Sequence, residues 1–113
     1  MPVPSLVAVN PPGWPLPRGH YSHALVHGGL VFVAGQLPID QVEGRPLTGA
    51  PIEAQARLAL ENMDIVLRAA GSRRTLVLKT TVFVTDIGLW DRVNTVYAAF
   101  FGEHRPARAI VPT

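Results

Sequence analysis

The stretch from Pro51 to Gly71 constrains the fold most, because it carries the clearest periodicity in the chain. Apolar residues recur there every three or four positions, which is the pattern of one buried helical face. These residues are Ala56, Ala59, Leu60, Met63, Val66, Leu67 and Ala70. Pro51 suits the first position of a helix, Glu53 suits the positive end of the helix dipole, and Gly71 suits the residue after the last turn. The sequence therefore predicts one long amphipathic helix.

A β-hairpin is predicted before this helix. Two apolar runs, residues 24–26 and 30–34, flank the turn His27–Gly28–Gly29, and a glycine turn between apolar runs is typical of a hairpin. Gly35 interrupts the end of the second run. A glycine at such a place marks a bulge or a close approach of the backbone to another group. Residues 40–49 are predicted to be a polar loop.

A strand, a second helix and a last strand are predicted after the long helix. Residues 76–84 alternate and are rich in Val, Thr and Phe, so we expect an amphipathic strand. Asp86 is placed to cap the second helix, and Gly102 is placed to close it. The apolar stripe of this helix contains Trp90, Val93, Tyr97 and Phe100 or Phe101. With the run Ala109–Val111, the order is β-β-α-β-α-β, which we interpret as an α+β domain with two helices on one mixed sheet.

Residues 1–19 differ from the rest because they contain six of the eleven prolines. Such a segment cannot be a helix and is a poor strand. We interpret it as an extended arm that wraps the domain with Trp14 as its anchor, while its composition also permits disorder. Residues 1–113 then form a single domain. Because only 16% of the residues are charged, we expect this domain to bury apolar surface in an oligomer.

Charge and residue content argue against several kinds of site. The net charge is +2, and the nine arginines and the single Lys79 form no basic stripe, which does not favour nucleic-acid binding. There is no cysteine and no phosphate-loop motif. His23 and His27 would stand about 13 Å apart on a strand, too far to share an ion, so we expect no metal and no cofactor. Without an apolar run of about 18 residues or a leading signal segment, we expect a cytoplasmic protein.

Three side chains are candidates for ligand binding, each with a structural alternative. Arg108 lies between two alanines at the start of the last strand, where its guanidinium could grip a planar carboxylate or simply neutralise a nearby acid. Tyr21 could be a half-buried aromatic residue or could close over a small ligand. Asn94 shares a helix face with Trp90, where it could cap a neighbouring loop or shape a polar pocket floor.

Five segments occur in an order and spacing that identify a family. They are GHYSHA (19–24), VFVAGQLPID (31–40), QARLALEN (55–62), KTTVFVTD (79–86) and VNTVYAAFFGEHRPARA (93–109). Together they cover nearly the whole chain from Gly19 on, and they resemble the Rid (YjgF-like) family of imine and enamine deaminases. The resemblance implies a chorismate-mutase-like subunit and a homotrimer whose three sheets close into a central barrel, with ligand clefts between subunits.

The resemblance also implies a reaction and the residues that serve it. The reaction is the cofactor-free hydrolysis of 2-imino acids of the 2-iminobutanoate and 2-iminopropanoate type, or of their enamines, to 2-oxo acids and ammonia. Arg108 matches the arginine that grips the substrate carboxylate, and Tyr21 matches a tyrosine that lines the cleft. Four further positions match residues near the ligand: Gly35 and Ile110 through their backbone, and Trp90 and Asn94 through their side chains.

The chain departs from the family in two places. His20 stands where the family commonly has proline, which suggests an altered substrate preference. The family continues past Thr113 into a last strand whose glutamate is thought to orient water, so we expect an intact mass above 12.2 kDa. Without that strand, the alternative is a module that binds a 2-oxo acid or amino acid without turnover. RNA cleavage or translation inhibition, also attached to the family, is less favoured by the near-neutral charge.

Overall fold

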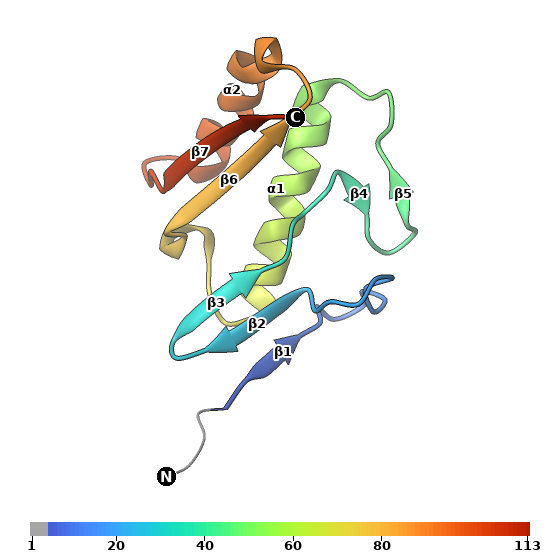
Figure 1. The fold of residues 1–113 in the computed structure, drawn as a ribbon, viewed down its shortest axis with the longest axis vertical. Helices are drawn as coiled ribbons and strands as arrows, with labels where there is room; N and C mark the ends of the chain where they lie inside the picture. Colours follow the sequence, from blue (N-terminus) through green and yellow to red (C-terminus); the bar gives the residue numbers. More distant parts are fainter. Residues whose placement is uncertain (1–4) are drawn as a thin grey trace.

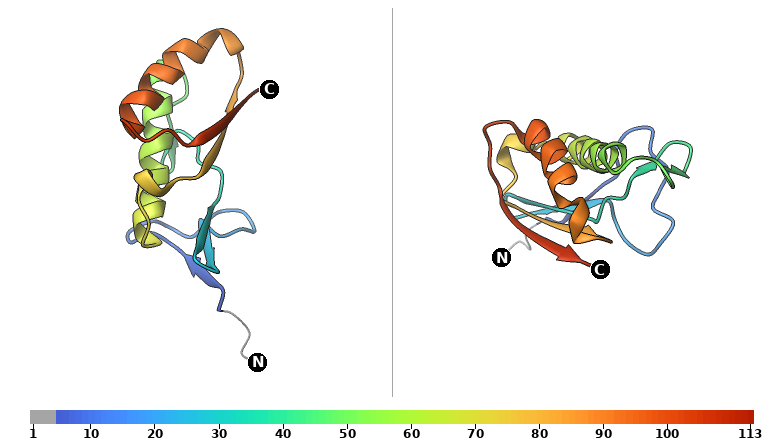
Figure 2. Two further views of the ribbon diagram at one scale, coloured as in Figure 1. Left: turned by 90° about the vertical axis from the view of Figure 1, so that its left-hand side faces the viewer. Right: turned by 90° about the horizontal axis from the view of Figure 1, so that it is seen from above.

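Two helices lie side by side on one face of a layer of short strands (Figure 1 and Figure 2). The computed structural model describes residues 5–113, so the first four residues of the predicted arm lie outside the described residues. None of the helices in the described part of the chain combines the length and apolar character needed to cross a membrane.

The longer helix, α1 (Ile52–Ala69), confirms the prediction from the apolar periodicity. Gly71 follows it with a φ of 84°, a left-handed conformation that glycine adopts without strain. The N–H of Ser72 donates to the carbonyl of Leu67 at 2.8 Å, which is the long hydrogen bond of a Schellman C-cap. The end of the helix is therefore set by the glycine that the sequence places there.

The predicted hairpin is also confirmed. β2 (Ala24–His27) and β3 (Leu30–Val33) are antiparallel and pair residue by residue from Ala24 with Val33 to His27 with Leu30. Gly28 and Gly29 have φ values of 59° and 77°, as the two central residues of a type I′ turn require.

The arm is not only extended, because β1 (Val7–Val9) pairs with β2. The expectation of a poor strand was wrong here: residues 5–10 contain no proline, so their backbone N–H groups can enter a ladder. Trp14 is buried as predicted, and its carbonyl accepts a hydrogen bond from Nδ2 of Asn10 at 2.9 Å. The core beneath the hairpin consists of Trp14, Ala24 and Val66, with Val9, Val31 and Val33 packed around it.

The predicted polar loop contains a second small hairpin. β4 (Ile39–Asp40) pairs with β5 (Arg45–Pro46). Oδ1 of Asp40 accepts from the backbone N–H groups of Val42 and Glu43 at 3.0 and 3.2 Å. This local turn, which Gly44 completes with a φ of 72°, brings the two short strands together.

The strand predicted over residues 76–84 is shorter than expected. β6 spans Lys79–Val84, and Arg74–Leu76 form a 3-10 turn instead. The guanidinium of Arg74 donates to both carboxylate oxygens of the buried Asp64 on α1, at 3.3 and 3.1 Å, and to the carbonyl of Phe100 at 3.0 Å. These long-range partners hold the chain in a turn where the local alternation alone favours a strand.

The last helix, α2 (Trp90–Phe101), connects β6 to the parallel strand β7 (Ala107–Pro112). Gly102 ends it with a φ of 64°, as predicted. Asp86 does not cap α2 itself. Its side chain accepts a backbone N–H of the 3-10 turn Ile87–Leu89, and α2 continues directly from that turn, so the predicted cap lies one turn before the helix.

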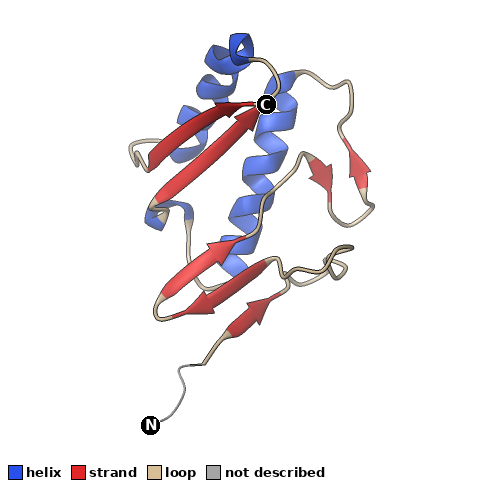
Figure 3. Cartoon of the chain, viewed as in Figure 1, coloured by secondary structure: helices blue, strands red, loops and turns tan. Residues whose placement is uncertain are grey.

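The strands form a small mixed layer under the two helices, but hydrogen bonds join them in three groups (Figure 3). The groups are the antiparallel β1-β2-β3, the short β4-β5 and the parallel β6-β7. On β6, Val84 is buried on the helix side, whereas Phe83 points the other way and is 66% exposed. Phe32 on β3 is 60% exposed. The side of the strand layer that faces away from the helices therefore exposes two large aromatic side chains.

Candidate functional site

Arg108, the second residue of β7, packs its side chain against α2. Its guanidinium carbon lies 4.4 Å from the centre of the Trp90 ring and 4.8 Å from the centre of the Tyr97 ring. Both distances are in the range of cation–π attraction. Trp90 and Tyr97 can both reach the arginine because residues two helical turns apart share a face.

Asn94 fixes the arginine further. Its Oδ1 accepts a hydrogen bond from Nη1 of Arg108 at 2.8 Å. In the structure the amide oxygen of Asn94 is bound to the arginine on β7 and not to a neighbouring loop. The structure brings together three of the residues that the sequence singles out: Arg108, Asn94 and Trp90.

No acid neutralises Arg108 within the described residues. The ion pairs there are Arg45–Glu43, Arg68–Asp64, Arg74–Asp64 and Arg92–Glu53. A guanidinium has five N–H donors, and Asn94 takes one of those of Arg108. Arg108 is also exposed. Its remaining donors, on Nε and Nη2 in particular, are thus available to an anion in solution.

Tyr97 and Thr80 complete the group, and the sequence reasoning missed their part in it. The Tyr97 hydroxyl and Oγ1 of Thr80 share a hydrogen bond of 2.7 Å. Thr80 on β6 stands directly opposite Arg108 on β7. The signal in the sequence was the position of Tyr97 in the apolar stripe of α2, because a buried tyrosine needs a partner for its hydroxyl. The identity of that partner depends on the pairing of β6 with β7.

Tyr21, Gly35 and Ile110 lie apart from the contacts of Arg108. Tyr21 is 55% exposed in the loop before β2, with its ring 6.2 Å from that of His23. A side chain added at Gly35 would meet nothing within 4 Å, so no neighbour within the described chain requires glycine there. Ile110 is half-buried, two residues after Arg108 on β7. Figure 1 shows the loop before β2 and the start of β7 on opposite sides of the molecule.

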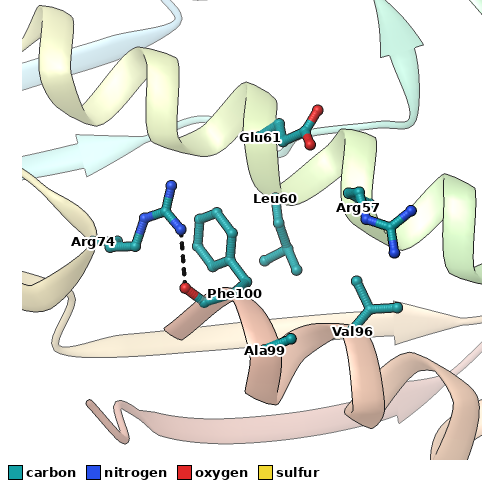
Figure 4. A pocket seen from close by; sticks show the side chains of 7 residues that line it. All are labelled: Arg57, Leu60, Glu61, Arg74, Val96, Ala99 and Phe100. Atoms are coloured by element: carbon teal, nitrogen blue, oxygen red, sulfur yellow. Dashed lines mark hydrogen bonds between the residues drawn. The ribbon is translucent and has the colours of Figure 1, made fainter. Parts of the chain in front are cut away.

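Arg108 lines neither of two hollows on the surface of the described residues. One, of about 220 Å³, lies between α1 and α2 (Figure 4) and is lined by Arg57, Leu60, Glu61, Arg74, Val96, Ala99 and Phe100. Arg74 is occupied there, because its guanidinium stacks 3.9 Å from the Phe100 ring and is bound to Asp64. The other, of about 300 Å³, lies beside β4 and β5. In a single chain Arg108 therefore sits on an open surface.

The described residues contain no cluster of three or more metal-ligating side chains. The clearest electrostatic perturbation also lies away from Arg108. The Arg92 guanidinium donates to both carboxylate oxygens of Glu53 at 2.6 and 2.8 Å, and these hydrogen bonds lower the pKa of Glu53 from 4.5 to about 2. The same bonds raise the pKa of Arg92. This pair links the two helices and has no contact with Arg108.

Comparisons by sequence and by structure both find relatives of this chain. A family model described as endoribonuclease L-PSP matches residues 13–113. A RutC family protein of Pyrococcus horikoshii is 43% identical over 97 residues, which are 86% of this chain and 76% of the relative. A 2-iminobutanoate/2-iminopropanoate deaminase of Salmonella typhimurium is 42% identical over 103 residues, with 86% of this chain and 77% of the relative covered.

A solved structure shares the fold. The protein of the conserved Rid family from Yersinia pestis, described as of unknown function, superposes with a TM-score of 0.90 at 34% identity, covering 96% of this chain and 86% of that one.

Proposed function

Because the chain belongs to the endoribonuclease L-PSP family, which includes the Rid (YjgF-like) proteins, we propose that it hydrolyses 2-imino acids or their enamine tautomers. The products are 2-oxo acids and ammonia. A relative that is 42% identical to this chain is named 2-iminobutanoate/2-iminopropanoate deaminase, and this name supports the reaction class. Substrates of this class are short 2-imino acids, each with a carboxylate beside the C=N bond.

The observation that carries the proposal is that the guanidinium of Arg108 is exposed and has only one protein acceptor among the described residues. A guanidinium binds a carboxylate best through two parallel N–H donors in one plane. Asn94 and the rings of Trp90 and Tyr97 hold the guanidinium of Arg108 while Nε and Nη2 stay free of protein acceptors in the described residues. Such a group suits the carboxylate of a 2-imino acid.

The chemistry demands little more than binding and orientation. Water adds to the electrophilic carbon of the imine, a proton moves to nitrogen, and the C–N bond of the resulting carbinolamine breaks to release ammonia. The carboxylate stays unchanged throughout, so Arg108 can hold it in substrate, intermediate and product. Fixing the reactant in one orientation lowers the barrier for addition of water.

A second subunit completes the site in this proposal. Arg108 lies on an open surface, Tyr21 and Gly35 lie elsewhere in the same chain, and the outer side of the strand layer exposes Phe32 and Phe83. We therefore place Tyr21 and Gly35 of one subunit over Arg108 of the next, in a homotrimer. Closed symmetry of this kind buries the same surface on every subunit.

A binding module without turnover is the second candidate. The observation that favours it is the lack, among the described residues, of a carboxylate or imidazole in contact with Arg108. Such a protein would hold the carboxylate of a 2-oxo acid or amino acid and leave an imine to react with water by itself.

The decay of an imine distinguishes the two candidates. An amino-acid oxidase generates the 2-imino acid continuously, and semicarbazide traps what has not been hydrolysed. Added protein should lower the amount of trapped imine in proportion to its concentration, with equal release of 2-oxo acid. If the protein binds 2-oxo acid saturably but leaves the trapped imine unchanged, it is a binding module and the proposed function is wrong.

A further inference from the structure

A pair of hydroxyl groups lies behind Arg108. Oγ1 of Thr80 and the hydroxyl of Tyr97 are 2.7 Å apart, and Tyr97 is only 6% exposed. Thr80 belongs to β6, Tyr97 belongs to α2, and Arg108 belongs to β7 at the position paired with Thr80. One hydrogen bond thus ties the helix to the strand next to the one that carries the arginine.

This bond restrains the ring on which the arginine rests. The Tyr97 ring packs against Phe101, with 4.7 Å between ring centroids, and lies 4.8 Å from the guanidinium carbon of Arg108. The hydroxyl group of Tyr97 is held by the hydrogen bond to Thr80. The other two partners of Arg108, Trp90 and Asn94, are also on α2. The distance and tilt between α2 and the two strands therefore decide how the guanidinium is oriented.

Orientation matters because Arg108 is exposed and long. An arginine side chain that is free in solvent samples many rotamers, and ordering it on ligand binding has an entropic cost. An arginine already held in one plane loses less entropy when it binds a planar carboxylate through two donors.

We propose that Thr80 and Tyr97 are positioning residues, which hold the guanidinium plane of Arg108 so that its Nε–Nη2 edge meets the substrate carboxylate. This role rests on the proposed function and adds two residues to it. Neither residue touches the substrate, and both act through Arg108.

The test uses variants that remove the hydroxyl bond and little else. Thr80→Val and Tyr97→Phe each delete one hydroxyl and keep the shape of the side chain. Thr80→Ser keeps the hydroxyl and serves as the conservative rescue. Thr75→Val is the matched control, because Thr75 is exposed in the 3-10 turn before β6 and its hydroxyl accepts a hydrogen bond from Nε of Arg73. Thermal unfolding checks that each variant is folded.

The first readout is binding of 2-oxobutanoate by calorimetry. Thr80→Val and Tyr97→Phe should each weaken 2-oxobutanoate binding by about two- to tenfold, the effect of one ordinary hydrogen bond. The double variant should be no weaker than the single ones, because both remove the same bond. Thr80→Ser and Thr75→Val should bind like the unmodified protein.

The second readout needs no ligand. The Nε–H signal of Arg108 in an NMR spectrum, assigned by its loss in Arg108→Lys, should shift and broaden in Thr80→Val and Tyr97→Phe but not in Thr75→Val. Folded Thr80→Val and Tyr97→Phe proteins with unchanged binding and an unchanged Arg108 signal would overturn the positioning role and leave the proposed function intact. If the unmodified protein binds no 2-oxo acid, the proposed function fails, and the Arg108 signal still decides whether the two hydroxyls position the arginine.

Discussion

At the scale of single residues, the site depends on contacts made across the fold around one arginine. The sequence could place Trp90 and Asn94 on one helix face, because that follows from a period of 3.6 residues. It could not show that Asn94 binds Arg108 or that Tyr97 lies beneath it, because both contacts depend on how β7 lies against α2. The interpretation of Arg108 as a surface residue that neutralises an acid finds no support among the described residues.

Replacing Arg108 tests the carboxylate anchor. Arg108→Lys keeps the charge but loses the planar fork, so 2-oxo acid binding should weaken by about 1.5–3 kcal/mol, the range for hydrogen bonds to charged groups. Arg108→Ala should reduce imine hydrolysis to the rate in buffer. Arg105 offers the control: it is exposed in the loop before β7, and Arg105→Ala should keep activity within a few fold. If Arg105→Ala abolishes imine hydrolysis and Arg108→Ala does not, the wrong arginine has been assigned to the site.

Asn94→Asp tests whether the donors of Arg108 must stay free. A carboxylate at position 94 would form an ion pair with the guanidinium and compete with the ligand for it. Binding of 2-oxobutanoate, measured by calorimetry, should fall by about tenfold or more. Asn94→Ala removes the amide without adding charge, so it should lose less affinity for 2-oxobutanoate than Asn94→Asp does. Equal or tighter binding by Asn94→Asp would show that the ligand does not use this guanidinium.

Among the helices and strands, sequence patterns predicted those elements whose formation depends on interactions between residues close in the chain. The helix α1 and the β2–β3 hairpin follow from periodicity and from glycines at their ends. The 3-10 turn over Arg74–Leu76 could not be predicted, because it is held by Asp64 and by the carbonyl of Phe100 in two distant helices. The strand β1 was not predicted because the prediction used the proline content of the whole arm. The stretch that forms β1 contains no proline.

The link between α1 and α2 predicts a specific acid dependence. Arg92 holds the pKa of Glu53 at about 2, below its usual 4.5, so the folded state favours the ionised carboxylate. Its contribution to stability is present above about pH 4.5 and is lost as the pH falls towards about 2. Urea unfolding should therefore show that Arg92→Gln is less stable than the unmodified protein near neutral pH, and that the difference shrinks as the pH falls through this range.

Salt gives an independent check on the same pair. Glu53 and Arg92 are both accessible to solvent, so added salt should screen the pair and reduce the difference at neutral pH. A stability difference that stays constant from neutral pH to about pH 2 would show that Arg92 acts through packing and not through the charge of Glu53.

At the scale of the whole molecule, one chain leaves both its outer strand face and its candidate site uncovered. Phe83 and Phe32 are more than half exposed on the side away from the helices, and exposed apolar surface of this kind marks an interaction site. We predict a trimer in sedimentation experiments at micromolar concentration. Phe83→Asp should yield monomers that no longer hydrolyse imines, whereas Val42→Asp in the β4–β5 turn should remain trimeric. A clean monomer of the unmodified protein would remove the basis for a shared site.

In the proposed trimer, Arg108 of one subunit and Tyr21 of its neighbour form one imine-hydrolysing site, and mixed oligomers show whether they do. Arg108→Ala and Tyr21→Ala chains are co-expressed with different tags, and oligomers that carry both tags are isolated. Each parent variant should be inactive, while in every mixed trimer one of the three interfaces regains both intact residues. We predict imine hydrolysis near that fraction of the unmodified rate. Mixed oligomers that form but remain as inactive as their parents would contradict the claim.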